Sequence, residues 1–109
     1  MSKSQIPKPP THLRLATRKW WQRVVTQWVL DEHHTRLLTL AAQAWDSGQE
    51  AREALRQHGL TYKTRFGEPK ARPEVKIEGD CRIQFARLIR ELNLDVPPPE
   101  EDNRPPRVR

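Results

Sequence analysis

The sequence predicts an all-helical fold of three helices, with one short extended or hairpin segment before the last helix. Three observations support this prediction. Apolar residues recur at helical spacing from residue 20, small and apolar residues continue such a spacing from residue 37 to residue 55, and a third helical stripe runs between residues 81 and 92. Between the second and third stripes, residues 60–77 lose the helical period.

Polar, proline-containing ends flank the predicted helices. Residues 1–10 contain three prolines and two lysines with little to bury, which predicts a flexible basic arm. Residues 11–96 form the one helical domain. Residues 97–109 combine prolines with acids and arginines, and we expect this tail to be disordered or in a polyproline II conformation.

The first helix has one apolar and one basic face. Thr17 is a suitable N-cap residue for it. The apolar face consists of Trp20, Trp21, Val24, Val25 and Trp28. The opposite face carries Lys19, Gln22, Arg23 and Thr26. The two faces therefore suit two different partners.

The second helix begins after Asp31, a good N-cap residue. A seam in alternating steps of four and three residues predicts one long helix and consists of Leu37, Ala41, Ala44, Gly48, Ala51 and Leu55. The helix ends near His58, and Gly59 is expected as a left-handed cap. Gly48 costs about 1 kcal/mol relative to alanine within a helix, so a break at Ser47 and Gly48 stays open as an alternative.

The segment after the second helix is predicted to be extended or a weak hairpin, with a tight turn near Gly67. Its exposed side is basic and carries Lys63, Arg65, Lys70, Arg72 and Lys76. The last helix begins at Pro73 or Glu78 and ends near Asn93. Its predicted buried stripe is Cys81, Phe85, Leu88, Ile89 and Leu92.

Positive charge is concentrated at the start of the chain. The 109 residues include 20 Lys and Arg against 14 Asp and Glu, for a net charge of +6. Residues 1–30 contain six basic residues and no acid, and residues 61–79 add a smaller excess. Clustered positive charge is typical of proteins that bind a polyanion, because phosphate contacts release condensed counterions. The predicted phosphate contacts are Arg14, Arg18, Lys19, Arg23, Lys63, Arg65, Lys70 and Arg72.

The predicted core is thin, which favours self-association. A folded chain of this length buries only about 65% of the surface that its unfolded form exposes. Small residues along the second helix allow another helix to approach closely, and tryptophans on apolar faces suit packing better than base stacking. The residues predicted at an oligomer interface are Trp20, Trp21, Trp28, Leu37, Ala41, Ala44, Trp45, Gly48, Ala51 and Leu55.

Several functional classes have no support in the sequence. There is no glycine-rich phosphate loop, no nucleophile elbow and no zinc-ligand spacing, so neither an enzyme nor a cofactor is expected. The possible metal ligands His12, His33, His34, His58 and Cys81 have no supporting pattern. The longest apolar stretch is too short to span a bilayer, and no signal-peptide core follows Met1, so neither membrane insertion nor secretion is expected. A lone cysteine suits a reducing cytoplasm.

The order of these elements resembles a known family. The strings KPPTHL, HGLTYKTRFGEPKARP and ARLIRELNL, in this order around a Leu-Leu-Ala-rich helix, are similar to the small terminase subunits of tailed bacteriophages, in the P-twenty-seven branch. The resemblance covers about residues 7–96. The matching positions are Pro10, His12, Leu13, Trp21, Gly59, Leu60, Gly67, Lys70 and Pro73. The C-terminal run from Leu92 to Pro97 departs from the family pattern.

The resemblance implies a small helical protein without a catalytic site. Such a protein forms a ring in the host cytoplasm, binds double-stranded viral DNA near the packaging start, and presents it to the large terminase subunit, which holds the ATPase and the nuclease. Residues 11–96 are then the oligomerisation and DNA-binding domain, and the tail or the last helix contacts the large subunit.

Two alternatives stay open from the residues alone. One is a helix-turn-helix transcriptional regulator that places residues 35–45 in the major groove, although this stretch has few polar side chains to read bases. The other is an adaptor that binds only protein. Such an adaptor has no salt-dependent affinity for DNA.

Overall fold

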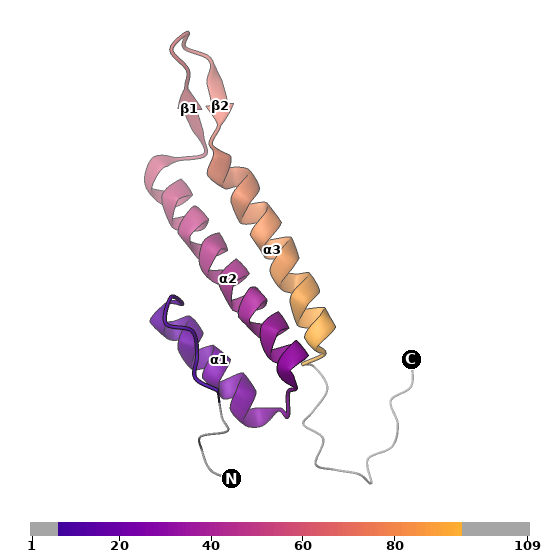
Figure 1. Cartoon of the computed structure of the whole chain (residues 1–109). Coiled ribbons are helices and arrows are strands. Elements are labelled where there is room, and N and C mark those ends of the chain that lie inside the picture. The colour runs from indigo at the N-terminus through magenta and orange to yellow at the C-terminus, as the bar shows by residue number, and fades with distance from the viewer. Residues whose placement is uncertain (1–6, 95–109) are drawn as a thin grey trace.

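Three helices and one two-stranded hairpin make up the fold. The computed structural model describes residues 7–94, in the order α1 (Leu15–Gln27), α2 (Glu32–His58), β1 (Thr61–Lys63), β2 (Pro69–Ala71) and α3 (Pro73–Leu92). Helices α2 and α3 run antiparallel along their lengths, α1 packs beside α2, and the hairpin projects beyond the end of the helical pair (Figure 1). The predicted element order is confirmed. The predicted tail at residues 97–109 and most of the arm at residues 1–10 lie outside the described residues.

Helix α1 begins earlier than predicted. Arg14 occupies the N-cap position and makes no side-chain capping bond. Thr17 lies inside the first turn, where its hydroxyl donates a hydrogen bond to Asp46 in α2. The prediction of Thr17 as the N-cap is therefore wrong. A carboxylate from the neighbouring helix accepts the main-chain N–H of Arg14 instead.

Helix α2 is continuous through Gly48, as the unbroken spacing predicts. Asp31 caps it, because its Oδ1 accepts the main-chain N–H of His34 at 2.8 Å. Gly48 is buried, and a Cβ built there would lie 3.2 Å from the Cβ of Cys81 in α3. Close helix packing therefore explains why glycine stands in the middle of this helix.

The end of α2 differs in detail from the prediction. Gly59 has a φ of 89° and a ψ of 174°, so it is not in the left-handed helical region. Its positive φ still favours glycine. The main-chain N–H of Gly59 donates to the carbonyl of Leu55 at 2.7 Å, and the chain then turns directly into β1.

Strands β1 and β2 pair antiparallel, with Tyr62 opposite Lys70 and Lys63 opposite Pro69. The turn joins Thr64 to Gly67 through a main-chain hydrogen bond of 2.9 Å, and Gly67 has a φ of 83°. This arrangement is a type I turn followed by a residue of positive φ, a common three-residue hairpin loop. The predicted turn near Gly67 is confirmed.

Helix α3 begins at Pro73, one of the two predicted starts, and ends at Leu92, followed by Asn93 as a C-cap in the left-handed conformation. Proline suits the first helical position, because a main-chain N–H there would have no partner within the helix. Of the predicted stripe, Cys81 and Leu92 are buried, while Phe85, Leu88 and Ile89 are half-buried. The stripe faces α2, along which α3 packs (Figure 1).

The core is small and lies where α1 meets the start of α2 and the end of α3. Its buried side chains are Leu13, Trp21, Val24, Leu38, Ala42 and Leu92. Trp21 also donates its indole N–H to the hydroxyl of Thr39 at 3.2 Å. Many large apolar side chains of the described residues stay exposed. No helix within residues 7–94 is long and apolar enough to cross a membrane.

Candidate nucleic-acid interface

Lys19 and Arg23 form an exposed basic pair on α1. They lie one turn apart on the side of the helix that faces away from Trp21 and Val24. Together with Gln22, Thr26 and Gln27 they line a shallow hollow. Within the described residues neither cation has an ion pair. Both ammonium and guanidinium groups are therefore available to an anion outside the chain.

Arg14, another predicted phosphate contact, is occupied within the chain. Its guanidinium donates two hydrogen bonds to the carboxylate of Glu53, at 2.9 and 3.0 Å. This pairing raises the pKa of Arg14 and lowers the pKa of Glu53. Arg14 therefore ties the start of α1 to the last third of α2.

Arg18 and Arg72 are less accessible than Lys19, Arg23 and the hairpin cations. Both side chains are half-buried, and the Nε of each is enclosed without a hydrogen-bond partner in the described part of the chain. The main-chain N–H of Arg72 donates to the carbonyl of Leu60 at 2.9 Å, which closes the base of the hairpin. These two arginines border the basic surfaces without being their most exposed members.

The hairpin carries the second exposed basic group. Lys63, Arg65 and Lys70 are exposed, and the Arg65 guanidinium lies 5.2 Å from the ring centre of Phe66. No ion pair within residues 7–94 involves any of these three cations. The hairpin therefore presents its charge to solvent together with an aromatic ring.

The two basic groups occupy separate parts of the molecule. Helix α1 runs along α2 from the level of Glu53 toward the start of that helix, as the contacts of Arg14, Thr17 and Trp21 show. The hairpin projects past the opposite end of α2 (Figure 1). One chain thus offers two basic surfaces along an elongated body of 66 × 37 × 20 Å.

A third basic group, at the base of the hairpin, was not predicted. Glu78 accepts hydrogen bonds from Arg52 at 2.8 Å and from Arg82 at 2.7 Å, and its side chain is only 13% exposed. Both arginines lower the pKa of this carboxyl, Arg82 the more. The four-residue spacing of Glu78 and Arg82 is visible in the sequence, but the contact with Arg52 requires the α2–α3 packing. Phe66 was likewise not singled out, although an aromatic residue beside a turn glycine was a visible signal.

The predicted interface residues fall into two groups. Ala41, Ala44, Gly48 and Ala51 are buried in this single chain, and Ala44 and Gly48 lie beside Cys81 of α3. Trp21 is buried in the core. In the structure, α3 of the same chain therefore packs against the small-residue seam. Leu37, Leu55, Trp20 and Trp28 are half-buried, and Trp45 is exposed.

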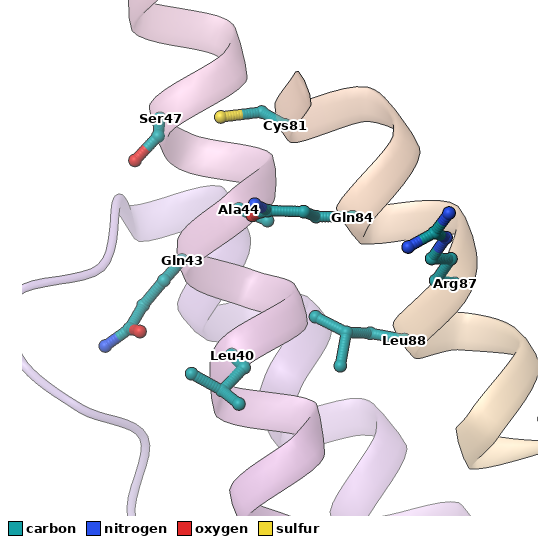
Figure 2. A pocket seen from close by; sticks show the side chains of 8 residues that line it. All are labelled: Leu40, Gln43, Ala44, Ser47, Cys81, Gln84, Arg87 and Leu88. Atoms are coloured by element: carbon teal, nitrogen blue, oxygen red, sulfur yellow. The ribbon is translucent and has the colours of Figure 1, made fainter. Parts of the chain in front are cut away.

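An aromatic cluster lies between α1, α2 and α3. The ring centre of Phe85 is 5.1 Å from that of Trp45 and 6.0 Å from that of Trp20. These rings line a cavity of about 370 Å³ together with Ala16 and Thr17. A second hollow, of about 440 Å³, lies between α2 and α3 and is lined in part by Leu40 and Leu88 (Figure 2). Cys81 and Leu88 point toward α2 there (Figure 2).

The helix-turn-helix alternative does not fit the observed helix. Residues 35–45 lie within the 27-residue helix α2, and Leu38, Ala41 and Ala42 on this stretch are buried. A recognition helix needs a free face with polar side chains to read base edges.

Within residues 7–94 there is also no group of three or more side chains that could hold a metal ion.

A helical chain with separate basic surfaces has the features of a nucleic-acid-binding subunit. The family described as "Phage terminase, small subunit" matches residues 17–97, so the chain belongs to the phage terminase small-subunit family. It is a non-catalytic DNA-recognition subunit that acts in phage DNA packaging. The family implies viral DNA and the large terminase subunit as partners. No curated protein and no solved structure matches the chain.

Proposed function

We propose that the chain belongs to the P-twenty-seven branch of the family and assembles into a ring in the host cytoplasm. This ring holds double-stranded viral DNA for the large terminase. Residues 11–96 are the oligomerisation and DNA-binding domain, flanked by a basic arm (1–10) and a tail (97–109). The observation that carries the DNA contact is the exposed Lys19–Arg23 surface of α1, which forms no ion pair with the other residues of the 7–94 range; Lys63, Arg65 and Lys70 are the second contact.

The other predicted phosphate contacts have secondary roles in this proposal. Arg14 is paired with Glu53, while Arg18 and Arg72 are half-buried. Phosphate neutralisation is strongest where a cation has no internal partner, because no existing ion pair must be broken. We therefore assign the main contacts to Lys19 and Arg23 and to the hairpin.

The salt dependence of DNA affinity tests this assignment. Plotted as log affinity against log salt, the slope should flatten by about one unit for each phosphate contact that Lys19→Ala plus Arg23→Ala removes. Arg36→Ala plus Lys76→Ala is the matched control, because these cations are paired with Glu32 and Asp80. An unchanged slope in the Lys19/Arg23 variant would remove α1 from the DNA site.

We further propose that copies associate through the aromatic cluster around Trp45 and the half-buried Trp20, because the small-residue seam is already covered by α3. A ring needs two different surfaces on each copy, and the exposed Leu40 and Ile83 are candidates for the second. Native mass spectrometry should give one closed multimer, which Trp45→Arg dissociates. A wild-type monomer at tens of micromolar would contradict the ring.

We assign the contact with the large subunit to the last helix or the tail, because the two basic surfaces are assigned to DNA. Deleting residues 97–109 should leave DNA affinity unchanged and weaken pull-down of the large subunit. If the truncated chain still binds the large subunit fully, the tail does not make this contact and α3 does.

A further inference from the structure

The hairpin tip has an exposed aromatic ring that the fold does not use. Phe66 is 80% exposed, and Leu60 at the hairpin base is 62% exposed. The hairpin lies beyond the end of the helices (Figure 1), and every residue from 61 to 71 except Thr64 is exposed. Phe66 is therefore absent from the hydrophobic core of the chain.

Hydrogen bonds hold the backbone of the tip, beside this ring, in a defined conformation. The Thr64 hydroxyl accepts the main-chain N–H of Phe66 at 3.2 Å and that of Glu68 at 3.3 Å. The main-chain N–H of Thr64 donates to the carbonyl of Glu68, and that of Gly67 donates to the carbonyl of Thr64, both at 2.9 Å. A tip fixed by four hydrogen bonds loses little conformational entropy when it binds.

The strand register places one lysine on each face of the ribbon. Lys63 pairs with Pro69, and Lys70 pairs with Tyr62 in the adjacent position. Since adjacent cross-strand pairs project to opposite faces, Lys63 and Lys70 flank the ribbon on both sides. Residues 61–72 contain four basic residues and one acid. A DNA groove has a phosphate backbone on each side, so the charge arrangement fits a duplex.

From this arrangement we propose that the hairpin bends duplex DNA. Phe66 inserts at a base step from the minor groove, while Lys63 and Lys70 contact phosphates on the two sides of the groove. Apolar wedges of this kind unstack a base step and kink the duplex. Arg65, which covers one side of the ring, moves to a phosphate when Phe66 enters. This inference rests on the proposed DNA-binding function.

The test measures bending and affinity together, with the full chain. A 30-base-pair duplex carries a donor and an acceptor fluorophore at its two ends, and wild-type binding should raise energy transfer. Phe66→Ala should abolish this rise and weaken binding by about tenfold. Phe66→Leu should retain most of the bend, because leucine is also an effective wedge. Leu60→Ala, which truncates another exposed apolar side chain of the hairpin region, is the matched control and should change neither readout.

Failure of the wedge is distinguishable from failure of DNA binding. If the wild type binds with a steep salt slope but does not bend DNA, or if Phe66→Ala bends it equally, the wedge is overturned and DNA recognition stands. If Phe66→Ala reduces the oligomer mass without changing the bend, the Phe66 side chain packs against another copy of the chain. The wedge is then likewise overturned. A wild-type chain without affinity for duplex DNA overturns both proposals.

Discussion

The Asp46 carboxylate accepts the Thr17 hydroxyl at 2.5 Å, and this buried contact joins α2 to the first turn of α1. The other carboxylate oxygen accepts the main-chain N–H of Arg14 at 2.8 Å. Asp46 is only 9% exposed. One side chain of α2 thus supplies the cap that α1 does not supply for itself.

Removal of this carboxylate should destabilise the fold. Asp46→Ala leaves the Thr17 hydroxyl and the Arg14 N–H without their acceptor, so we expect the free energy of unfolding to fall by about 3 kcal/mol. Asp46→Asn keeps one carbonyl acceptor and should cost less. Urea unfolding at a single protein concentration measures both, because the proposed self-association would make stability depend on concentration. Equal stability of wild type and Asp46→Ala would refute the role of Asp46.

Two helical glycines should respond differently to alanine. Nothing lies within 4 Å of a Cβ built at Gly79, so Gly79→Ala should stabilise the protein by about 1 kcal/mol through helix propensity. At Gly48 the new methyl group would lie 3.2 Å from the Cβ of Cys81, so the strain should cancel or exceed the same gain. Thermal unfolding compares the two variants directly. A similar stabilisation at both positions would contradict the close packing of α2 on α3.

Acid should weaken the link between α2 and α3. Arg82 and Arg52 hold the pKa of Glu78 below its ordinary value of 4.5, so the carboxylate stabilises the fold above that pH. This contribution is lost as the pH falls through the lowered folded-state value. Glu78→Gln should therefore have a lower unfolding temperature at pH 7 and a shallower decline between about pH 5 and pH 3. Glu91→Gln is the control, since Glu91 has no ion pair in the described chain. An unaltered pH profile of Glu78→Gln would count against the link.

Arg14 should contribute little to DNA affinity, despite its place in the basic N-terminal segment. Arg14→Gln combined with Glu53→Gln keeps the net charge and removes one internal ion pair. We expect this double variant to keep the wild-type salt slope, in contrast to Lys19→Ala plus Arg23→Ala. Filter binding at four or more salt concentrations gives the slopes. A flattened slope in the Arg14/Glu53 variant would show that Arg14 contacts phosphate and would contradict this prediction.

Local patterns predicted much of this fold. The seam of α2 stays in phase across Gly48, the Asp31 cap lies next to its helix, and Gly67 marks a turn that needs a positive φ. Each of these features depends on residues close together in the chain, so spacing and residue type were sufficient.

The features that sequence reasoning missed depend on long-range contacts. The start of α1 is set by Asp46, 29 residues after Thr17, and the pairing of Arg14 is set by Glu53, 39 residues away. Charge density placed Arg14 among the exposed cations, because a single sequence does not show which acids α2 brings to it. For the same reason the sequence did not show which chain supplies the neighbour of the seam, and in the structure α3 covers Ala44 and Gly48.

The continuity of α2 has a mechanical consequence. A helix of 27 residues is a stiff rod about 40 Å long. Because α1 is fastened along it and the hairpin follows its far end, the proposed contacts between copies and the hairpin tip lie along the same rod. In the proposed ring, the packing of the copies therefore sets where Phe66 lies.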